Sequence, residues 1–315
     1  MTTRLEAPVT VFFYRRPDHL EKVMTRVKQA APKILFGVSD GPKPDQEESR
    51  RGVEESRRVF RAMVDWPCRW QLLERKTNLG SYLSVSRGLD QVFREVSETL
   101  ILEDDTVPDP TFFRFGAELL ERFRNDERIG SICGSNFDEP GTWQTANSYR
   151  YTRYHHGWGW ATWKRAWRYF DNDENLKKIL TDKKWRKKQG LSREEWAYWD
   201  RCFRHTFAFR MDVWDYRWTL SLWAKGMSCI VPRWNLVRNI GFDSLGTNTV
   251  DPNWAGDAMH GTRPMSFPLR HPVKLEVDIA KDRKVFLRHY ARLEGRRNPW
   301  EKIRDAFRRV IWKKV

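Results

Sequence analysis

Short apolar runs alternate with longer amphipathic stretches through the first 135 residues of the chain. The runs are rich in β-branched and aromatic residues, which is typical of strands buried on both faces. The stretches between them place apolar residues at helical spacing. This alternation predicts an α/β fold with a doubly wound, mostly parallel sheet flanked by helices. The expected strands are 9–14, 34–38, 70–73, 99–102, 129–133 and 228–231, and the expected helices are 19–31, 46–64, 81–96, 112–123 and 214–225.

Polar residues follow three of these expected strands directly: Arg15-Arg16, Asp40 and Glu103–Asp105. Because ligands of such sheets bind beyond the carboxyl ends of the strands, we expect the three groups to gather at one edge. Arg16 is a candidate to pair with a phosphate or a base, and Asp40 a candidate to accept from a nucleobase N–H. The alternatives are a surface arginine and an Asx turn.

The triplet Glu103-Asp104-Asp105 places three like charges directly after a buried strand. A hard divalent cation would relieve their repulsion, and Mg²⁺ normally combines one or two protein carboxylates with substrate phosphates. The triplet therefore predicts a phosphate-bearing substrate that is bound through a metal. The alternative is an acidic turn before the helix at 112, with Asp109 as its cap.

Two further groups in the second half of the chain are candidates for acid–base chemistry. Asp212 and Asp215 flank Trp214, and a carboxylate near a metal is suited to act as general base for a sugar hydroxyl. The alternative is a helix cap with an ion pair to Arg217. His155 and His156 are adjacent, and we expect at most one of them to face the site.

The net charge of +16 is uneven, since residues 281–315 contribute +9 of it. Within them, 298–315 place Trp300, Phe307 and other apolar residues on one helical face with Lys and Arg between. This predicts a basic amphipathic helix that lies on an anionic membrane surface, the alternative being a solvated face. The alternative outside enzymology is a basic nucleic-acid-binding protein, but a nucleic-acid partner is not expected, because no readout motif accompanies the charge.

The cysteines and the apolar runs indicate the compartment. Four cysteines stand without CxxC pairs, so we expect buried free thiols in a reducing environment. No signal-like segment begins the sequence, and no apolar run reaches the length of a membrane span. These features predict a cytoplasmic protein, with peripheral attachment to the inner face of the membrane through its basic tail.

Two segments of the second half have no clear strand or helix pattern. The basic stretch 177–188 is expected to be mobile, and 241–249 to be a loop.

Taken in order, several motifs resemble the GT-A fold glycosyltransferases, and most closely a bacterial group with an EDD triplet. More distantly, the chain is similar to the eukaryotic N-acetylglucosaminyltransferases that start complex N-glycans, which invert, depend on manganese and use UDP-sugars. The resemblance covers about residues 8–272. Its motifs are Tyr14-Arg15-Arg16-Pro17, 39–43 (SDGPK), Asn78-Leu79-Gly80, the triplet, 157–163 (GWGWATW) and 239–247 (NIGFDSLGT).

The resemblance implies a role for individual residues. Arg16 and Asp40 match uridine contacts, and we assign Asn78, Gly80 and Asp104 to the nucleotide site with them. Asp105, with Glu103, matches the metal position, and Asp215 matches the catalytic base. Arg15 departs from the usual Asn, and Asn248 stands near a position where relatives often carry His. We further expect contacts to donor or acceptor sugar from the aromatic loop and the histidine before it: His156, Trp158, Gly159 and Trp160.

The implied enzyme transfers a sugar from a nucleotide-diphosphate donor, UDP-sugar by resemblance, to a glycan or lipid-linked acceptor, with Mn²⁺ or Mg²⁺ and with inversion. The aromatic loop has an alternative as a hydrophobic plug at the sheet edge. The rival enzyme is a nucleotidyltransferase or sugar-phosphate pyrophosphorylase, although the chain lacks the expected Gly-rich phosphate loop after the first strand. We expect a transferase domain at 1–272, divided near 135, and a basic tail at 273–315.

Overall fold

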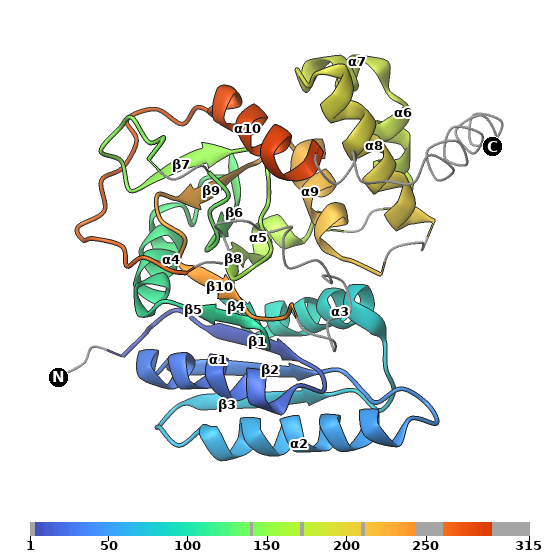
Figure 1. Ribbon diagram of the computed structural model, residues 1–315, viewed down its shortest axis with the longest axis vertical. Coiled ribbons are helices and arrows are strands. Elements are labelled where there is room, and N and C mark those ends of the chain that lie inside the picture. Colours follow the sequence, from blue (N-terminus) through green and yellow to red (C-terminus); the bar gives the residue numbers. More distant parts are fainter. Residues whose placement is uncertain (1–3, 139–140, 171–172, 209–211, 243–260, 292–315) are drawn as a thin grey trace.

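The computed structural model describes five stretches of the chain, drawn as ribbons in Figure 1: 4–138, 141–170, 173–208, 212–242 and 261–291. The expected helix at 298–315 and most of the expected loop at 241–249 lie outside them.

An eight-stranded sheet forms the centre of the molecule, in the order β3-β2-β1-β4-β8-β6-β9-β7. β7 and β8 run against the other strands, which are parallel to one another. The predicted mostly parallel sheet is therefore confirmed. The strands are β1 (Val9–Phe13), β2 (Ile34–Ser39), β3 (Arg69–Glu74), β4 (Glu98–Glu103), β6 (Ile129–Cys133), β7 (Tyr149–Thr152), β8 (Trp160–Trp163) and β9 (Ser228–Pro232).

Helices cover both faces of the sheet, because its inner strands are apolar on both sides. On β4, Leu100 and Leu102 face the cluster that holds α1 and α4, whereas Ile101 faces the cluster under α3, α5 and α9. This alternation is the two-residue period of a strand. The helices concerned are α1 (Pro17–Ala30), α2 (Glu47–Met63), α3 (Gly80–Glu95), α4 (Pro110–Arg122), α5 (Lys164–Trp167) and α9 (Asp215–Ala224).

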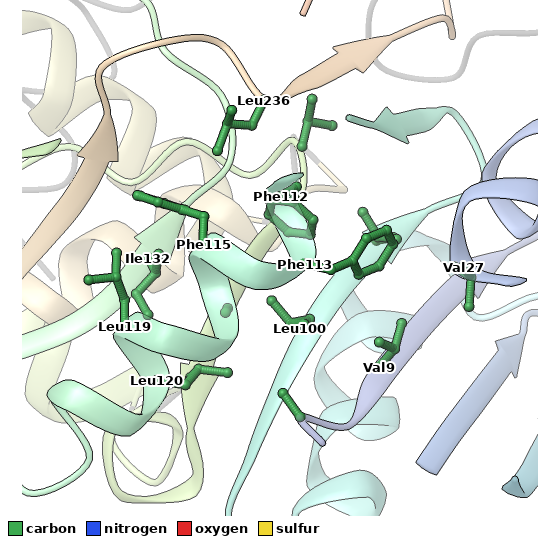
Figure 2. Packing of buried hydrophobic residues seen from close by; sticks show 14 of the residues in the cluster. Val9, Val27, Leu100, Phe112, Phe113, Phe115, Leu119, Leu120, Ile132 and Leu236 are labelled. Carbon is green, nitrogen blue, oxygen red and sulfur yellow. The ribbon is translucent and has the colours of Figure 1, made fainter. Parts of the chain in front are cut away.

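Helix α4 shows how one face is filled. Asp109 caps the start of α4 by accepting from the Thr111 N–H at 2.8 Å. The sequence predicts this cap as part of the alternative interpretation of the acidic triplet. Phe112, Phe115 and Leu119 then point into the core over β4 and β6 (Figure 2). A short ribbon of β5 (Thr106–Pro108) and β10 (Val237–Asn239) crosses beside it.

A helical cap, made of α6, α7, α8, α10 and η2, packs at the end of the molecule away from α1 and α2 (Figure 1). Its interior is aromatic, with Trp199 and Phe203 of α8 at the centre. The bounds are α6 (Asp173–Thr181), α7 (Lys183–Lys188), α8 (Arg193–Phe207), α10 (Ile279–Val285) and the π-helix η2 (Phe286–Tyr290).

The expectation for 177–188 was wrong. This stretch is helical, in α6 and α7, because Leu176 and Leu180 recur at helical spacing and are buried in the cap. Asp182 caps α7 by accepting from the Lys184 and Trp185 backbone N–H groups. The charged residues conceal this short apolar period.

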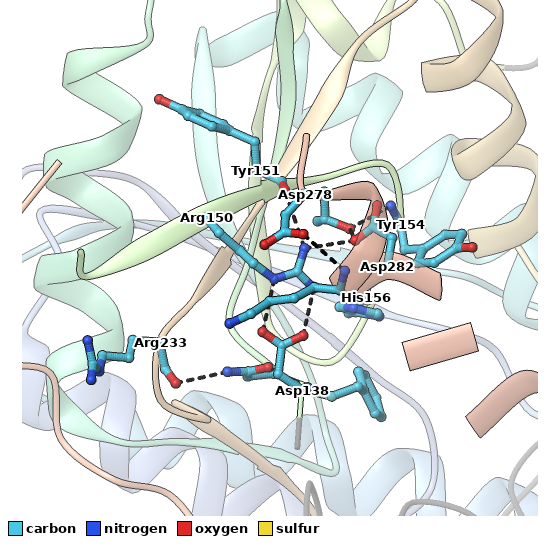
Figure 3. Close-up of polar contacts among 12 residues, drawn as sticks. Asp138, Arg150, Tyr151, Tyr154, His156, Arg233, Asp278 and Asp282 are labelled. Atoms are coloured by element: carbon cyan, nitrogen blue, oxygen red, sulfur yellow. Dashed lines mark hydrogen bonds and ion pairs between the residues drawn. The ribbon is translucent and has the colours of Figure 1, made fainter. Parts of the chain in front are cut away.

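Helix α10 and η2, which follow the expected domain border at 272, are fixed to the sheet. Arg150 of β7 donates to Asp138 through Nε and Nη2, at 2.9 and 2.6 Å, and to Asp282 of α10 through Nη1, at 2.7 Å (Figure 3). Asp282 also accepts from Thr152 Oγ1 at 2.7 Å. All these side chains are buried, so removal of any one of them would leave an unpaired buried charge and destabilise the fold. Phe286 completes the aromatic core of the cap.

None of the helices in the five described stretches has the length and apolarity to cross a membrane. The four cysteines are free, as predicted, and three of them are buried, whereas Cys68 is only partly buried, against the prediction.

The position of the border can be tested with two shortened chains. A chain that ends at residue 291 should melt close to the full-length protein, since it keeps α10 and η2. A chain that ends at 272 leaves one arm of the buried Arg150 unpaired and uncovers the cap, at a cost of about 3–5 kcal/mol or more, so it should melt roughly 10 °C lower. Equal melting temperatures, measured by calorimetry, would contradict this assignment.

Candidate functional site

A cavity of about 330 Å³ opens at the carboxyl ends of β1, β2 and β4, where the sequence predicts the ligand site. It collects most of the predicted site residues: Arg16, Asp40, Asn78, Gly80, Glu103, Asp104, Asp105, His156, Trp158 and Asp215. The cavity also reaches the helical cap, through Trp199 of α8 and Tyr290 of η2.

Arg16 pairs with two members of the acidic triplet. The parallel register sets Phe12 beside Glu103, so the residues after β1 lie next to Asp104 and Asp105. One nitrogen of Arg16, Nη2, donates to Asp104 at 2.6 Å and to Asp105 at 2.7 Å. Asp104 also accepts from the Tyr14 N–H at 3.1 Å. The second terminal nitrogen of Arg16, Nη1, is buried and has no hydrogen-bond partner.

Glu103 is the member of the triplet that Arg16 does not reach through a hydrogen bond. Burial, followed by the charges of Asp105, Asp104 and Asp215, raises the pKa of Glu103 from 4.5 to about 8. Within the described chain, the Glu103 carboxylate has no hydrogen bond or ion pair. These three charges act on it because the four carboxyl groups surround the same cavity.

Gly241 leaves space for this arrangement. A Cβ at this position would lie 2.1 Å from Asp105 Oδ2 and 3.0 Å from Arg16 Nη1. The Ile240 N–H donates to the Asp105 carbonyl at 2.8 Å, which ties the end of the β10 strand to the triplet. The backbone of residues 239–241 therefore covers Asp105, and it lies so close that only glycine fits at position 241.

Asp40 is engaged by its own turn. Its two carboxylate oxygens accept from the N–H groups of Gly41, Leu79 and Gly80 and from the Asn78 amide, at 2.8 to 3.1 Å. The Asx-turn alternative thus describes its present contacts, while the predicted nucleobase contact stays a prediction. By these bonds Asp40 fixes the Asn78–Gly80 turn at the cavity wall.

Asp212 and Asp215 have different tasks. Asp212 accepts from the Ser81 and Tyr82 N–H groups at 2.9 and 3.0 Å, so it caps α3 rather than the helix that follows it. Asp215 stands in the first turn of α9 and lines the cavity, with one oxygen accepting from the Tyr216 N–H at 2.9 Å. Burial raises the pKa of Asp215, an effect that the nearby His155 opposes.

Both histidines line the cavity, against the expectation of at most one, because 153–157 is not regular strand. His155 Nδ1 lies 3.1 Å from Ser131 Oγ, and His156 Nδ1 lies 3.4 Å from the Tyr290 hydroxyl. Both Nε2 atoms are buried without a partner. Burial holds the pKa of His156 well below its usual value, so this imidazole is neutral.

The aromatic loop divides between the cavity and the core. Trp158 lines the cavity, whereas Trp160 is completely buried in β8, stacked on Trp214 with ring centroids 4.9 Å apart. Gly159 has a φ of +59° and packs against Val237. The sugar contacts expected of Trp160 and Gly159 are therefore not supported by their positions, and the plug alternative describes Trp160.

The cavity contains two aromatic residues of the helical cap that the sequence did not single out. Tyr290 comes from beyond the expected domain, and Trp199 from a helix that the sequence did not predict. No local pattern marks either residue, since each is positioned by the packing of the cap. The wall that they form is aromatic, with ring centroids 5.2 Å apart.

The described residues contain no group of three or more His, Cys, Asp or Glu that could hold a metal by itself. The donors present still fit a hard cation that is completed by phosphates. Glu103 and the Asp105 oxygen that Arg16 does not bind are carboxylate donors at one cavity, and their mutual repulsion would fall when a cation binds.

No protein-family model and no curated protein matches the chain. Similar solved structures include UDP-glucose pyrophosphorylase complexed with UDP-glucose (6% identity, TM-score 0.36, covering 72% of this chain and 90% of that one). Others are the inositol-1-phosphate CTP transferase from T. maritima (11%, 0.36, 72% and 85%) and mouse xyloside xylosyltransferase 1 (12%, 0.34, 69% and 81%). Because their identities and TM-scores are this low, these structures do not indicate a reaction for this chain.

The raised pKa of Glu103 predicts how stability depends on pH. Between pH 4.5 and about 8 the folded state keeps a proton that the unfolded state has lost, so the free energy of unfolding falls as the pH rises. In metal-free buffer, Glu103→Gln should raise the melting temperature by several degrees at pH 8 and by almost nothing at pH 4.5. The exposed Glu21→Gln is the control, and a pH-independent difference between Glu103→Gln and wild type would contradict the assignment.

Proposed function

We propose that this protein is a glycosyltransferase that moves a sugar from a nucleotide-diphosphate donor to a hydroxyl group. The observation that carries the proposal is the cavity, in which Arg16 and the acidic triplet stand at the strand ends and Asp215 shares the same space. The unpartnered nitrogen of Arg16 can donate to a diphosphate, and the separate carboxylate of Asp215 can accept the proton of a hydroxyl nucleophile.

The donor nucleotide would lie at the ends of β1 and β2. Arg16 Nη1 is buried and unpartnered, so it is available to a phosphate or base oxygen. The Asn78–Gly80 turn and Lys43 form the adjoining wall. UDP as the nucleotide rests on the family resemblance.

A divalent cation, Mn²⁺ or Mg²⁺, would be held by Asp105 and Glu103 together with the diphosphate of the donor. Bound there, it would neutralise the charge that develops on the leaving diphosphate. Asp104 would keep Arg16 in position, since it accepts from Arg16 at 2.6 Å. Gly241 leaves the space that Asp105 needs.

Asp215 would take the proton from the acceptor hydroxyl as the new bond forms at the anomeric carbon. Its raised pKa makes it a stronger base than a solvent-exposed aspartate. A single displacement of this kind inverts the anomeric configuration. One oxygen of Asp215 is anchored by the Tyr216 N–H, which leaves the other for the hydroxyl.

The acceptor would lie between the loop at 155–158 and the helical cap. His156 carries a neutral, unpartnered Nε2, and the partly buried Trp158 offers flat aromatic surface beside the more deeply buried Trp199 and Tyr290. Such a mixture of rings and polar atoms suits a sugar. The predicted basic helix at 298–315 would bind an anionic membrane surface at the cytoplasmic face. An enzyme held there would be close to a lipid-linked glycan, which is therefore the acceptor that we favour.

The donor class can be tested with a ligand panel. UDP, GDP, dTDP, CMP and ATP are each added with Mn²⁺ or with EDTA, and stability is followed by thermal shift and affinity by calorimetry. One nucleoside diphosphate should stabilise the protein only with the metal, and Asp105→Ala should abolish that gain. A response to nucleoside triphosphate and sugar phosphate, with release of pyrophosphate, would indicate the rival nucleotidyltransferase instead.

The base role of Asp215 predicts a separation of binding from turnover. Asp215→Asn keeps the shape and the acceptor oxygen of the side chain, so the affinity for the nucleotide found in the panel should not change. Release of nucleoside diphosphate from the sugar donor should fall by about 100- to 10,000-fold. The exposed Asp65→Asn serves as control, and an unchanged rate in Asp215→Asn would exclude it as the base.

A further inference from the structure

The net charge of the protein is confined to two segments. Residues 177–188 hold seven Lys or Arg and one acidic residue, a net charge of +6. Residues 281–315 hold +9, so the two segments carry +15 of the total of +16. The rest of the chain is therefore nearly neutral, with +1. A charge so localised exerts a directed field rather than a uniform one.

The structure places the first segment on the helical cap, at its outer surface. Lys183, Lys184, Lys187 and Lys188 of α7 are exposed, and no ion pair involves them within the described stretches. Some exposed basic residues elsewhere have acidic partners, such as Arg50 with Glu47 at 2.5 Å and Arg128 with Asp126 at 2.7 Å. The one carboxylate inside the segment, Asp182, is occupied as the cap of α7.

The described part of the second segment lies on the same cap. Arg283 of α10 is 3.5 Å from Glu195 of α8, and Phe286 packs on Tyr198 of α8 with ring centroids 5.7 Å apart. Both α7 and α10 stand at the end of the molecule opposite α2 (Figure 1). The described parts of the two segments, 177–188 with +6 and 281–291 with +3, therefore place much of the positive charge that the structure describes on the helical cap.

The kind of basic residue indicates the kind of partner. The whole chain has 39 Arg and 19 Lys, yet 177–188 have six Lys and one Arg. Arginine provides the forked contacts that recognise nucleic acids, whereas lysine is a compact point charge. Juxtamembrane lysine clusters bind anionic lipid surfaces through such point charges. The Trp185 ring packs on Trp196, 5.9 Å away, so the contact would be electrostatic and would not depend on insertion of this indole.

We propose that the exposed lysine face of α7 is a docking surface for an anionic lipid bilayer. It is formed by residues other than those of the predicted helix at 298–315. The cap that carries α7 also supplies Trp199 and Tyr290 to the cavity wall, so docking at this face would orient the cavity relative to the headgroups. The inference does not depend on the reaction that the cavity catalyses.

The test measures binding of the full-length protein to vesicles without nucleotide. Vesicles contain about one third phosphatidylglycerol in phosphatidylcholine, and pure phosphatidylcholine is the reference. Replacement of Lys183, Lys184, Lys187 and Lys188 by Gln should weaken binding to the anionic vesicles at least about tenfold. The matched control replaces four exposed lysines at the opposite end, Lys22, Lys28, Lys33 and Lys76, by Gln and should bind like wild type.

A third variant, with the same four α7 lysines changed to Arg, keeps the charge and should also bind like wild type. Circular dichroism confirms that each variant is folded. The proposal is overturned if wild type does not bind anionic vesicles, if the α7 and control Gln variants lose affinity equally, or if neither does. It is also overturned if the α7 Gln variant loses affinity for a duplex oligonucleotide while vesicle binding is unchanged.

Discussion

Electrostatic repulsion among the carboxylates at the end of β4 is the constraint on which the site depends. A hydrophobic strand delivers Glu103, Asp104 and Asp105 to a cavity where water screens them poorly. Arg16 neutralises two of them with one nitrogen, and Gly241 keeps the space around them open. Glu103 has no ion pair within the described chain, and burial with the neighbouring carboxylates raises its pKa to about 8, although the charge of Arg16 opposes this. The site is thus arranged around negative charge that the folded chain compensates only in part.

The remaining walls of the cavity come from distant parts of the sequence. Asp212 caps α3 from 130 residues further along, and Tyr290 reaches His156 from η2. The buried Arg150, shared between Asp138 and Asp282, holds η2 and α10 against the sheet. The contacts of Tyr290 and Arg150 are polar contacts between buried side chains, where removal of one partner is costly for the other. The cavity therefore depends on contacts well outside the strand ends that define it.

The sequence predicts the sheet and the strand-end residues because both follow from local patterns. Apolar runs mark buried strands, and parallel strands bring Arg16, Asp40 and the triplet to one edge whatever the rest of the chain does. It could not predict α6 and α7, where a brief apolar period is hidden among lysines. Nor could it predict that Trp160 turns inward while Trp158 lines the cavity, since that depends on β8 pairing with β4 and β6. The entry of Tyr290 into the cavity follows from tertiary packing alone.

The aromatic wall of the cavity contains Tyr290, which comes late in the sequence, and this has a consequence for synthesis of the protein. Arg16 and the triplet are complete once the first 105 residues have been made, whereas Tyr290 follows 185 residues later. At usual rates of translation this interval lasts roughly ten to forty seconds. For that time the acidic edge of the sheet exists without its aromatic wall. The pairing of Arg16 with Asp104 and Asp105 is therefore a contact that can protect the nascent edge before the cavity is closed.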